Sequence, residues 1–551
     1  MSGAVAVGDR GLLVPVEGPT EARALATAVA AARWPGVLDA VVGMRSVLIT
    51  AEPGRVTPAE LIERVAGLRT SEVVVAEPRL HRLPVVFDGP DLEEVCRLAG
   101  VSSEEVAATL ATTTLEVAML GFSPGFAYLT GLPRELAALP RRAEPRASVP
   151  AGSVALAGGF AAVYPQSTPG GWQLVGRTPV QLFDPVTPPF ALLRPGDTVR
   201  LDPVPPDGST SHSVATTGAP SRRPPLRPPD GVLGALVVEE PGLLTTVQDA
   251  GRLSLAHLGV PGGGPADPLS QALANRLVGN PWHTPALEVT VRGPVLRCLA
   301  PVHVAVVGGD TPVSVDGREV GTGHVVPLAV GQRLTVGPVR HGVRCALAVA
   351  GGLAVTSVLG SSSTDVLSWL GPGPLINGDM LGVVGPLRPM ADRLAPDAPG
   401  DLAGRGRRRV LRVLPGPHPA WFPADVLARL AAAPFVVGTS SDRVGLRLVP
   451  SSGATIERVA GELDSQGVVT GAIQVPPDGR PVVLGPDHAT VGGYPVAAVV
   501  AACDGWLLGQ CGPGDEVELL PVTADEAAAA FVTLREACRS ATIGRYPSVP
   551  A

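Results

Sequence analysis

Aromatic side chains in glycine- and proline-rich segments are the first candidates for chemistry in this chain. The segments are residues 119–133, MLGFSPGFAYLTGLP, and residues 149–179, VPAGSVALAGGFAAVYPQSTPGGWQLVGRTP. Aromatic residues make up only 3% of the chain, and those in these segments include Phe122, Phe126, Tyr128, Tyr164 and Trp172. Glycine lets the main chain approach a ligand closely, so the segments predict a binding surface whose rings could stack on a ligand. Tight turns of a small β-barrel filled by aromatic side chains would give the same pattern.

Arginine supplies all the strong positive charge of the protein, because no lysine occurs among its 43 basic residues. This absence excludes a P-loop, whose lysine reaches the phosphates, and it excludes a lysine Schiff base. It also excludes a biotin-bearing lysine and a serine–lysine catalytic pair. A phosphate or carboxylate can be held here by arginine, whose planar guanidinium can bind two oxygens.

Composition and charge narrow the class of protein further. At roughly 100 to 200 residues per domain, 551 residues allow several domains with separate cores. The net charge of −7 argues against a nucleic-acid-binding protein, which would concentrate basic residues on one face. The opening residues lack a signal-peptide pattern and the apolar stretches are short, so we expect a cytoplasmic protein. No CxxC pair occurs among the six cysteines. We therefore expect neither a metal site nor a disulfide framework.

The first 85 residues alternate between strand-like and helix-like segments. Their order, β-α-β-β-α-β, predicts a ferredoxin-like domain. The expected strands are residues 11–16, 37–42, 46–51 and 72–75, and the expected helices are residues 20–33 and 57–68. Two short helices should follow, because Asp91 with Glu94 and Ser102 with Glu105 have the spacing of a capping box. Beyond them, short β-runs broken by Gly and Pro favour a barrel or a sandwich.

Turn motifs repeat along the β-rich part of the chain. RPGD at 194–197 resembles GPGD at 512–515, and NGD at 377–379 is a weaker third copy. We interpret them as Gly-Asp turns that close several related β-barrels just before the last strand. Between the two β-rich blocks, residues 203–229 are rich in Pro, Ser, Thr and Arg without apolar periodicity, which predicts a linker.

Both β-rich blocks carry long motifs of one protein family. Residues 1–203 contain GFSPGFAYLTGLP, PRRAEPRASVPAGSVALAGG and PGGWQLVGRTP, and they resemble allophanate hydrolase subunit 1, also called the B component of 5-oxoprolinase or the KipI type. Residues 236–522 contain LTTVQDAGRLSLAHLGVPGGGPADPLSQALANRLVGNP, SDRVGLRL and GAIQVPPDGRPVVL, and they resemble allophanate hydrolase subunit 2, also called the C component of 5-oxoprolinase or the KipA type. The chain is therefore similar to a fusion of two subunits that are usually separate.

The resemblance implies an α+β, β-rich fold in which an N-terminal ferredoxin-like domain is followed by cyclophilin-like β-barrel domains. The repeated Gly-Asp turns agree with such a series of barrels. The predicted domains are 1–85, ferredoxin-like; 86–203, a cyclophilin-like barrel; 204–232, the Pro-rich linker; 233–400, the first part of the subunit 2 region; 401–522, its second, cyclophilin-like part; and 523–551, a C-terminal helix and tail.

The resemblance further implies a component of an ATP-dependent 5-oxoprolinase, which opens the lactam of 5-oxoproline to glutamate together with a LamB/YcsF-type subunit. The substrate is then a small-molecule amide, and ATP with Mg²⁺ is the implied cofactor. Phosphorylation of the amide oxygen would create a better leaving group before water attacks. Such a site needs positive charge for phosphate, donors for a carboxylate, and a general acid or base. No nucleic acid or membrane is expected as a partner, and self-association into a homo-oligomer stays open.

Site residues are assigned from these motifs. His488 in PDHATVGGYP is our choice for proton transfer, and Asp249, Arg252 and Asp267 complete the expected catalytic set. Substrate or nucleotide binding is expected of Gly125, Phe126, Tyr128, Arg142, Gly152, Ser153, Tyr164, Gly170, Gly171, Trp172, Arg177, Gln248, Asn275, Glu288, Arg443, Gln474, Gly492, Gly493 and Tyr494. No metal ligand is assigned. The alternatives are structural: a hydrogen-bonding role for His488, ion pairs for the arginines, and capping for the two aspartates.

Two other functions stay open. Similarity to the carboxyltransferase region of urea carboxylases suggests a second enzyme, although the chain has no biotin-bearing AMKM motif and no room for a biotin carboxylase domain. Kip-type relatives include an inhibitor of a sporulation histidine kinase and its antagonist, which suggests a regulator. The first half also departs from the family pattern, with Leu110 replacing a histidine, Leu115 and Ala118 replacing tyrosines, and Phe160 replacing a glutamine.

Overall fold

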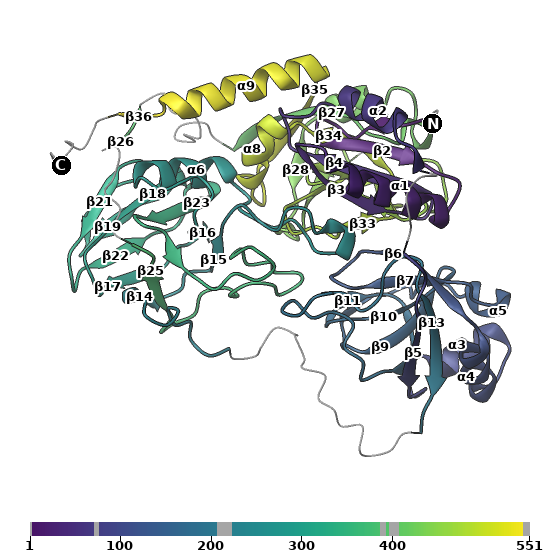
Figure 1. Cartoon of the computed structure of the whole chain (residues 1–551). Helices are drawn as coiled ribbons and strands as arrows, with labels where there is room; N and C mark the ends of the chain where they lie inside the picture. Colours follow the sequence, from purple (N-terminus) through teal and green to yellow (C-terminus); the bar gives the residue numbers. More distant parts are fainter. Residues whose placement is uncertain are drawn as a thin grey trace.

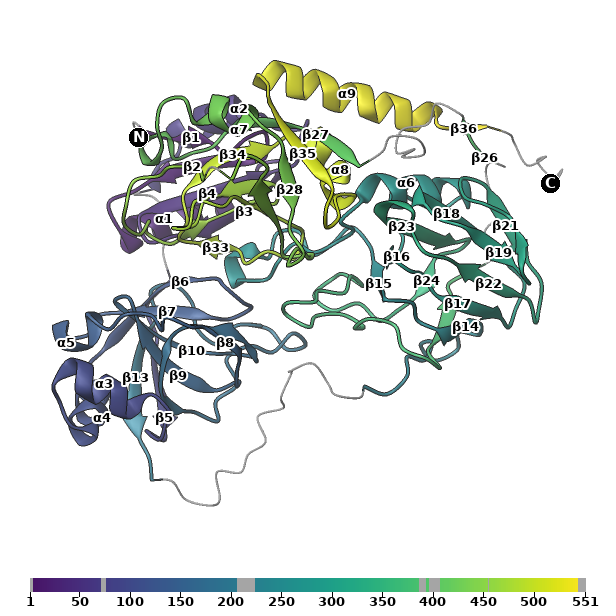
Figure 2. The ribbon, with the colours of Figure 1, turned by 180° about the vertical axis from the view of Figure 1, so that it is seen from behind.

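A computed structural model of the chain describes residues 3–70, 76–205, 223–385, 393–395, 407–453 and 455–543. The described residues form four bodies: the N-terminal domain (residues 5–66), the first-half sheet (80–203), the second-half sandwich (234–383) and the C-terminal barrel (408–521). Figures 1 and 2 show the N-terminal domain beside the C-terminal barrel, with the first-half sheet below this pair and the second-half sandwich to its side. Helix α9 (Ala524–Ser540), drawn in yellow, runs across the top from the barrel toward the sandwich. In these residues no helix is both long enough and apolar enough to cross a membrane.

The N-terminal domain is an antiparallel sheet with the order β1-β2-β4-β3, against which two helices pack. The bounds are β1 (Val5–Ala6), β2 (Gly11–Pro15), α1 (Pro19–Ala32), β3 (Val37–Val42), β4 (Ser46–Ala51) and α2 (Pro58–Ala66). Helix α2 starts after Thr57, which forms a capping box with Glu60. Strand β1 was not expected, and the other five elements match the expected ones within two residues. The strand expected at 72–75 lies outside the described residues, so the ferredoxin-like assignment stays a prediction.

The first-half sheet has seven strands in the order β12-β9-β10-β7-β6-β13-β5. A bridge between Val86 and Arg177 brings the β5 end of the sheet next to β12, so the sheet curls toward a barrel. Strand β5, which the expected boundary at residue 85 places in the N-terminal domain, pairs in parallel with β13. The bounds are β5 (Leu80–Val85), α3 (Leu92–Ala99), α4 (Ser103–Thr112), β6 (Leu115–Leu120), β7 (Ala127–Thr130), α5 (Arg134–Ala137), β8 (Arg146–Val149), β9 (Ser153–Ala157), β10 (Phe160–Val163), β11 (Thr168–Gly170), β12 (Gln173–Arg177) and β13 (Thr198–Pro203).

The two expected capping boxes have different outcomes. Ser102 and Glu105 form one at the start of α4, as predicted. The prediction for Asp91 is wrong, because its carboxylate makes no cap hydrogen bond to α3. It accepts hydrogen bonds instead from the Arg142 guanidinium and the Leu174 amide, both at 2.7 Å. Capping-box spacing therefore predicts a cap only where no cationic side chain from elsewhere in the fold competes for the carboxylate.

The second half begins with two sheets that pack face to face as a sandwich. One sheet has the order β20-β19-β22-β17-β14-β25-β24 and the other β15-β16-β23-β18-β21, and α6 (Pro268–Leu277) packs on β18 and β23. The strand bounds are β14 (Gly234–Glu240), β15 (Leu244–Gln248), β16 (Ala286–Thr290), β17 (Val295–Cys298), β18 (Val302–Asp310), β19 (Val313–Val315), β20 (Arg318–Glu319), β21 (Val325–Leu328), β22 (Arg333–Val336), β23 (His341–Val349), β24 (Leu353–Ala354) and β25 (Met380–Val383). Apolar residues from both sheets fill the space between them.

The C-terminal part is a closed barrel with the order β27-β34-β31-β32-β29-β28-β35. The bounds are β27 (Arg408–Pro415), α7 (Val426–Ala431), β28 (Phe435–Val437), β29 (Gly445–Pro450), β31 (Ala472–Gln474), β32 (Val482–Leu484), β34 (Val496–Val500), α8 (Gly505–Gly509) and β35 (Glu516–Pro521), with the outer pairs β30 (Gln466–Gly467) and β33 (Val491–Gly492), and β26 (Arg393–Leu394) and β36 (Thr542–Ile543). Helix α9 follows β35 and is capped by Thr523.

In each Gly-Asp turn, the aspartate before the last strand of a body accepts a hydrogen bond from a residue that precedes the first strand of that body. Asp197 accepts a hydrogen bond from the Arg79 amide just before β5, and Asp515 accepts one from the Arg407 side chain just before β27. In both bodies the strand after the turn pairs in parallel with that first strand. Asp379 likewise accepts from the Leu226 amide, but there β14 and β25 are antiparallel. The repeated turn is thus observed three times. In the middle body the strands form two sheets, and a bridge between Arg292 and Pro338 connects one sheet to the other.

The N-terminal sheet and the C-terminal barrel share one apolar core although they stand at opposite ends of the sequence. The Met44 amide donates to the Ser465 carbonyl over 3.0 Å, and the Asp9 carboxylate accepts from the Ala502 amide over 2.8 Å. A Cβ on Gly467 would come within 2.6 Å of Leu48, so only glycine allows β30 to approach β4 this closely. Residues from the beginning and from the end of the chain are thus packed against each other.

Candidate functional site

Three loops of the second half meet between the sandwich and the barrel. They are residues 249–264, residues 358–371 and residues 485–490. The Arg252 side chain donates to the Ser363 carbonyl over 2.7 Å, which joins the first loop to the second. The Gly263 amide donates to the Pro486 carbonyl over 3.0 Å, which joins the first loop to the third. Polar residues from distant parts of the sequence therefore converge at this junction.

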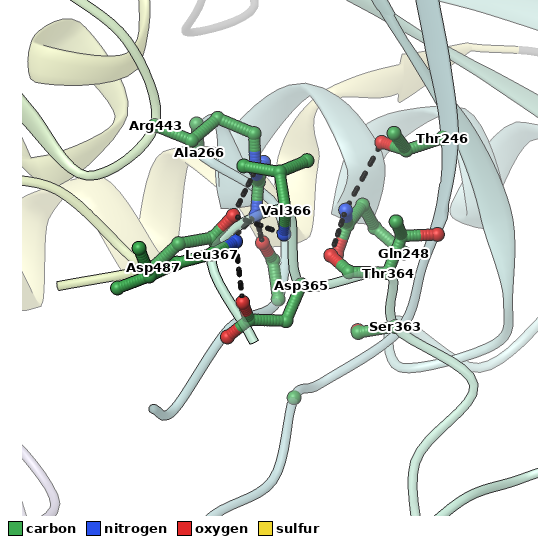
Figure 3. A network of polar contacts seen from close by, with 12 residues as sticks. Thr246, Gln248, Ala266, Ser363, Thr364, Asp365, Val366, Leu367, Arg443 and Asp487 are labelled. Atoms are coloured by element: carbon green, nitrogen blue, oxygen red, sulfur yellow. Dashed lines mark hydrogen bonds and ion pairs between the residues drawn. The ribbon is translucent and has the colours of Figure 1, made fainter. Parts of the chain in front are cut away.

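Arg443 is the centre of a buried ion-pair network at the junction. Its Nε and Nη2 atoms each donate to the Asp487 carboxylate over 2.8 Å, and Nη1 donates to Glu288. Figure 3 shows Arg443 and Asp487 pointing toward each other. Burial disfavours the charged guanidinium, but Asp487 and Glu288 outweigh this effect and raise the pKa of Arg443. Glu288 also pairs with Arg344 at 3.5 Å. Each charge in the network is thus matched by an opposite one.

Asp365 lies beside this network, and its carboxyl group keeps its proton near neutral pH. Its Oδ1 accepts hydrogen bonds from the amides of Leu367 and Ser368, at 2.8 and 2.6 Å. Within the described part of the chain, its buried Oδ2 has no hydrogen-bond partner. Burial, and then the charge of Asp487, raise the pKa of Asp365 to about 7. A buried carboxyl group that keeps its proton near neutral pH beside an ion-paired carboxylate can act as a proton donor.

Asp249 holds the serine-rich loop in place. It accepts hydrogen bonds from the Ser361 hydroxyl at 2.5 Å, the Ser363 hydroxyl at 2.7 Å, the Ser362 amide at 2.6 Å and the Gly251 amide at 2.9 Å. A carboxylate that already accepts four hydrogen bonds is well suited to orient this loop. In this structure Asp249 therefore positions the residues around Arg252, and its expected catalytic role stays a prediction.

Arg252 keeps one donor available. Nε donates to the Val358 carbonyl over 3.1 Å and Nη2 to the Ser363 carbonyl, while the buried Nη1 has no partner among the described residues. A Cβ on Gly263 would lie 3.8 Å from this Nη1, and around the neighbouring Gly262 the space within 4 Å is open. Burial lowers the pKa of Arg252, because the charged form loses solvation. A buried cationic donor beside open backbone can bind an oxygen anion.

The junction also contains buried polar atoms of Gln248 and Thr364. Gln248 donates through Nε2 to the Thr246 hydroxyl and the Thr364 carbonyl, both at 3.0 Å, as Figure 3 shows. These bonds fix the orientation of its amide, and the buried Oε1 has no partner in the described ranges. The Thr364 hydroxyl is unpartnered in the same way. Such buried, unsatisfied atoms are uncommon in folded proteins and point to a bound molecule or water.

The other second-half residues that we predicted take mostly structural positions. Asp267 caps α6 through the Ser270 amide at 2.9 Å, which is the capping alternative, and burial raises its pKa. Asn275 bridges the carbonyls of Trp282 and Thr284. The Nδ1 of His488 lies 2.7 Å from the Ala489 carbonyl, and burial lowers its pKa, so the ring is neutral at pH 7 with the proton on Nδ1.

The first-half aromatic residues form a buried cluster. The ring of Phe126 lies 5.1 Å from that of Tyr128, 5.2 Å from that of Tyr164 and 5.7 Å from that of Trp172. All four are less than 10% exposed, and they belong to the apolar core shared with the N-terminal sheet and the C-terminal barrel rather than to the core inside the first-half sheet. They therefore pack between domains, whereas the alternative had expected them to fill a barrel. Burial raises the pKa of Tyr164 to about 12. A Cβ on Gly170 would come within 2.3 Å of the Tyr164 hydroxyl, so this glycine gives the ring room.

The remaining first-half predictions lie around this cluster. Arg142 pairs with Asp91, and Arg177 pairs with Asp88 at 3.0 Å, as the ion-pair alternative expects. The amide of Gly152 donates to the Tyr164 carbonyl, and the Gly171 carbonyl accepts from the Arg142 amide. Ser153 starts β9 and is buried. The Gly125 amide donates over 2.9 Å to the Leu258 carbonyl, which connects the first-half turn to the loop that carries Arg252.

Three departures from the family pattern are core positions. Leu110, Leu115 and Ala118 are fully buried, so these side chains pack in the apolar interior. Phe160 is partly buried and stacks on Trp172 with ring centroids 6.4 Å apart.

A separate groove on the C-terminal barrel contains two predicted residues. Gln474 and Tyr494 line it, and the Gln474 Nε2 approaches the Tyr494 carbonyl at 3.5 Å. A Cβ on Gly492 would come within 2.8 Å of the same Nε2, so Gly492 makes room for Gln474. Gly493 follows it in the turn before β34. This part of the predicted binding set is thus apart from the loop junction.

Sequence reasoning missed Asp365 and Asp487, which the junction brings together. Asp487 comes directly before His488 in the motif PDHATVGGYP, which we selected. Nothing in that motif, however, indicated that Asp487 pairs with Arg443. Asp365 follows three serines and a threonine, a run that carries no recognised motif. The separation of 121 residues between Val366 and Asp487, whose amide and carboxylate meet, explains why spacing along the chain could not reveal the pair.

Comparison with known proteins identifies the family. The model of the carboxyltransferase domain, subdomains C and D, matches residues 4–193, and that of subdomains A and B matches residues 258–521. Residues of the second half are 33% identical over 294 residues to the 5-oxoprolinase C component of Escherichia coli (strain K12), covering 52% of this chain and 91% of that protein. The chain belongs to the carboxyltransferase-domain family of the 5-oxoprolinase B and C components.

Further relatives support this family membership. The 5-oxoprolinase B component of Escherichia coli O157:H7 is 43% identical over 173 residues, covering 31% of this chain and 79% of that protein. Urea amidolyase of Saccharomyces cerevisiae is 31% identical over 306 residues, but this chain spans only 17% of it. The crystal structure of the protein TTHA0988 has a TM-score of 0.80 and 38% identity, covering 93% of this chain and 99% of that chain. A chain of the same extent and a β-rich carboxyltransferase-type fold is therefore known from crystals.

Proposed function

We propose that this chain supplies both the B and the C component of an ATP-dependent 5-oxoprolinase that works with a LamB/YcsF-type subunit. The observation that carries the proposal is that one chain contains, in order, a relative of the B component and a relative of the C component of that enzyme. Fusion keeps the two components at equal amounts and at a high effective concentration, as expected for parts of one enzyme. The reaction opens a small cyclic amide, and ATP when bound supplies the phosphoryl group that activates the amide.

The loop junction has groups suited to such a substrate. In this proposal the free Nη1 of Arg252 binds a carboxylate or the amide oxygen, and the Oε1 of Gln248 accepts the amide N–H. The carboxyl of Asp365, with its pKa near 7, donates the proton that the nitrogen requires when the C–N bond breaks. The neutral His488 accepts a proton from the attacking water through Nε2. Asp487 and Arg443 keep these groups in position.

A reconstituted assay tests the proposed function. The purified chain is mixed with its LamB/YcsF-type partner, and ATP hydrolysis and glutamate formation are measured with 5-oxoproline, urea, allophanate or no substrate. The proposal expects turnover that requires 5-oxoproline, ATP and both proteins. Absence of turnover with 5-oxoproline under conditions where the Escherichia coli subunits are active would overturn it.

A carboxyltransferase-like activity is the second candidate, because the second half is also similar to part of urea amidolyase. Transfer of a carboxyl group would require a biotin carrier on another protein, because this chain has no lysine to bear biotin. The same assay distinguishes the two candidates. Carboxylation of urea that depends on an added biotinylated carrier would favour the carboxyltransferase, and glutamate formation without biotin would favour the lactam hydrolase.

A further inference from the structure

A cavity of about 180 Å³ lies where the N-terminal domain meets the loop junction. Its wall includes Arg10 of the N-terminal domain, Gly263 of the first junction loop, Pro486 of the third junction loop, and Arg443. A cavity of about 150 Å³ can hold a molecule the size of benzene, so this one suits a small ring compound. Both halves of the chain therefore form one small cavity that adjoins the loop junction.

Arg10 is the arginine of this wall that keeps a free donor. Its buried Nε has no hydrogen-bond partner among the described residues. Arg443, by contrast, is ion-paired with Asp487 and Glu288. Arg344, which also lines the cavity, pairs with Glu288 at 3.5 Å. A buried guanidinium nitrogen without a partner is uncommon in folded proteins, and it points to a ligand or water in the cavity.

A turn before β2 holds Arg10 at the cavity. The Arg10 amide donates to the Val7 carbonyl over 3.1 Å, and the Arg10 carbonyl accepts from the Ala51 amide over 2.9 Å. The neighbouring Asp9 carboxylate accepts from the Ala502 amide of the barrel over 2.8 Å. The backbone at Arg10 is thus fixed within its own domain, and the residue before it is bonded to the other half of the chain.

One acidic side chain also faces this space. Asp442 is the carboxylate among the described lining residues. Its Oδ1 accepts hydrogen bonds from the amides of Val444 and Gly445, at 2.8 and 3.2 Å. These bonds hold Asp442 in its own turn. Because the other two arginines of the wall are ion-paired, the Arg10 guanidinium is the group best placed to bind an anion that enters the cavity.

Two groups of the proposed reaction lie near the cavity. A Cβ on Gly263 would lie 3.8 Å from the Nη1 of Arg252, so the glycine leaves no side chain between the cavity and this nitrogen. Burial lowers the pKa of His488, and the charge of Arg10 acts in the same direction. Arg10 is therefore close enough to His488 for its charge to act on the ring.

We propose that Arg10 binds the carboxylate of 5-oxoproline in this cavity, so that the N-terminal domain completes the substrate site of the second half. The inference rests on the proposed function and refines it, because the Nη1 of Arg252 is then left for the amide oxygen. The planar guanidinium of Arg10 suits the two oxygens of a carboxylate. The fusion of the two components follows the same logic, since neither half alone contains both arginines.

Binding of two ligands to the full-length chain, without ATP or partner, tests this assignment. Calorimetry measures the affinity for 5-oxoproline and for 2-pyrrolidone, which has the same lactam ring but no carboxylate. Arg10→Gln removes the charge, and Arg10→Lys keeps the charge without the planar pair of donors. Arg45→Gln is the matched control, because Arg45 is an exposed arginine of the same domain, between β3 and β4, and does not line the cavity. Thermal unfolding confirms that each variant is folded.

The expected result is a loss that depends on the carboxylate. The unaltered chain should bind 5-oxoproline at least about tenfold more tightly than 2-pyrrolidone, because a charge-assisted hydrogen bond is added. Arg10→Gln should weaken 5-oxoproline binding at least about tenfold and leave 2-pyrrolidone binding unchanged. Arg10→Lys should keep part of the preference for 5-oxoproline, and Arg45→Gln should keep all of it.

Three results would overturn the assignment. Unchanged affinity for 5-oxoproline in Arg10→Gln would place the carboxylate elsewhere and leave the 5-oxoprolinase proposal intact. An equal loss for both ligands, without recovery in Arg10→Lys, would give Arg10 a structural role. No binding of 5-oxoproline by the chain, combined with turnover when the partner is added, would assign the carboxylate to the partner. Binding that depends on Arg10 without turnover in the reconstituted assay would instead support the carboxylate site and count against the proposed function.

Discussion

The Asp487 carboxylate binds the Arg443 guanidinium through two hydrogen bonds of 2.8 Å, and both side chains are buried. The pair joins a turn of the barrel to the junction, because the Val366 amide also donates to Asp487, over 3.3 Å. Fixing a negative charge here has a second effect, since it holds the neighbouring Asp365 in a state where its proton is retained near neutral pH. One ion pair thus supports both the packing of the loops and the proton chemistry that we propose.

Removing the Asp487 charge should destabilise the fold. In Asp487→Asn the buried Arg443 keeps only Glu288 as a charged partner, and breaking a buried ion pair costs about 3 kcal/mol or more of unfolding free energy. Urea unfolding at pH 7 measures the loss. The matched control is Asp88→Asn, which breaks the exposed pair with Arg177 and should cost less than about 1 kcal/mol. Equal losses in the two variants would contradict the prediction.

The pKa of Asp365 predicts a pH dependence of stability. Its pKa is about 7 in the folded chain against 3.8 for an ordinary aspartate, so the folded state binds its proton more tightly. The stability from this group is present in acid and decreases as pH rises from about 4 to 7, where the unfolded chain has already released the proton. Asp365→Asn, which resembles the protonated acid, should lose less stability over this range. Urea unfolding at pH 5 and pH 8 makes the comparison, and parallel changes in both proteins would refute the assignment.

The hydrogen bond between His257 and Asp39 predicts that the stability of the fold decreases as pH rises, because the imidazolium of His257 loses its charge. Burial disfavours the imidazolium, but the hydrogen bond to Asp39 outweighs this and raises the pKa of His257. The contact joins the Arg252 loop to β3, with Nδ1 3.0 Å from the carboxylate. Its stabilisation is present below pH 6.5 and is lost as pH rises through the folded-state pKa. Asp39→Asn should therefore destabilise the chain more at pH 6 than at pH 8.5.

The size of this effect is small because the His257 side chain is 46% exposed. We expect less than about 1 kcal/mol, reduced further by added salt. Thermal unfolding at two pH values and two salt concentrations measures it. A loss in Asp39→Asn that is the same at both pH values would mean that only the neutral hydrogen bond matters.

His488→Ala should reduce turnover in the reconstituted enzyme by about 100-fold or more, since a general base contributes on this scale. The substitution removes the neutral imidazole, whose Nδ1 is tied to the Ala489 carbonyl. His283→Ala, at an exposed position, is the control and should leave the rate unchanged. Turnover by His488→Ala within about threefold of the unaltered chain would leave His488 with a structural role.

Local structure could be predicted well from the sequence. The capping pair of Ser102 with Glu105 predicted the start of α4, because both partners lie within one helical turn. The Gly-Asp turns at Asp197 and Asp515 were visible because glycine and aspartate specify the turn locally. Family motifs likewise identified both halves of the chain, since long glycine-rich segments are specific even without a structure.

The tertiary structure alone decided which polar residues share a site. Arg443 meets Glu288 across 155 residues of chain and Asp487 across 44, and no local rule relates such positions. The same holds for Asp91, whose capping spacing is overridden by Arg142 because a buried carboxylate is more stable beside a cation than at a helix end. The sequence by itself determined the elements, the turns and the family. Burial and long-range charge pairing, which depend on the folded chain, determined that Asp365 holds a proton and that Arg443 lies between Asp487 and Glu288.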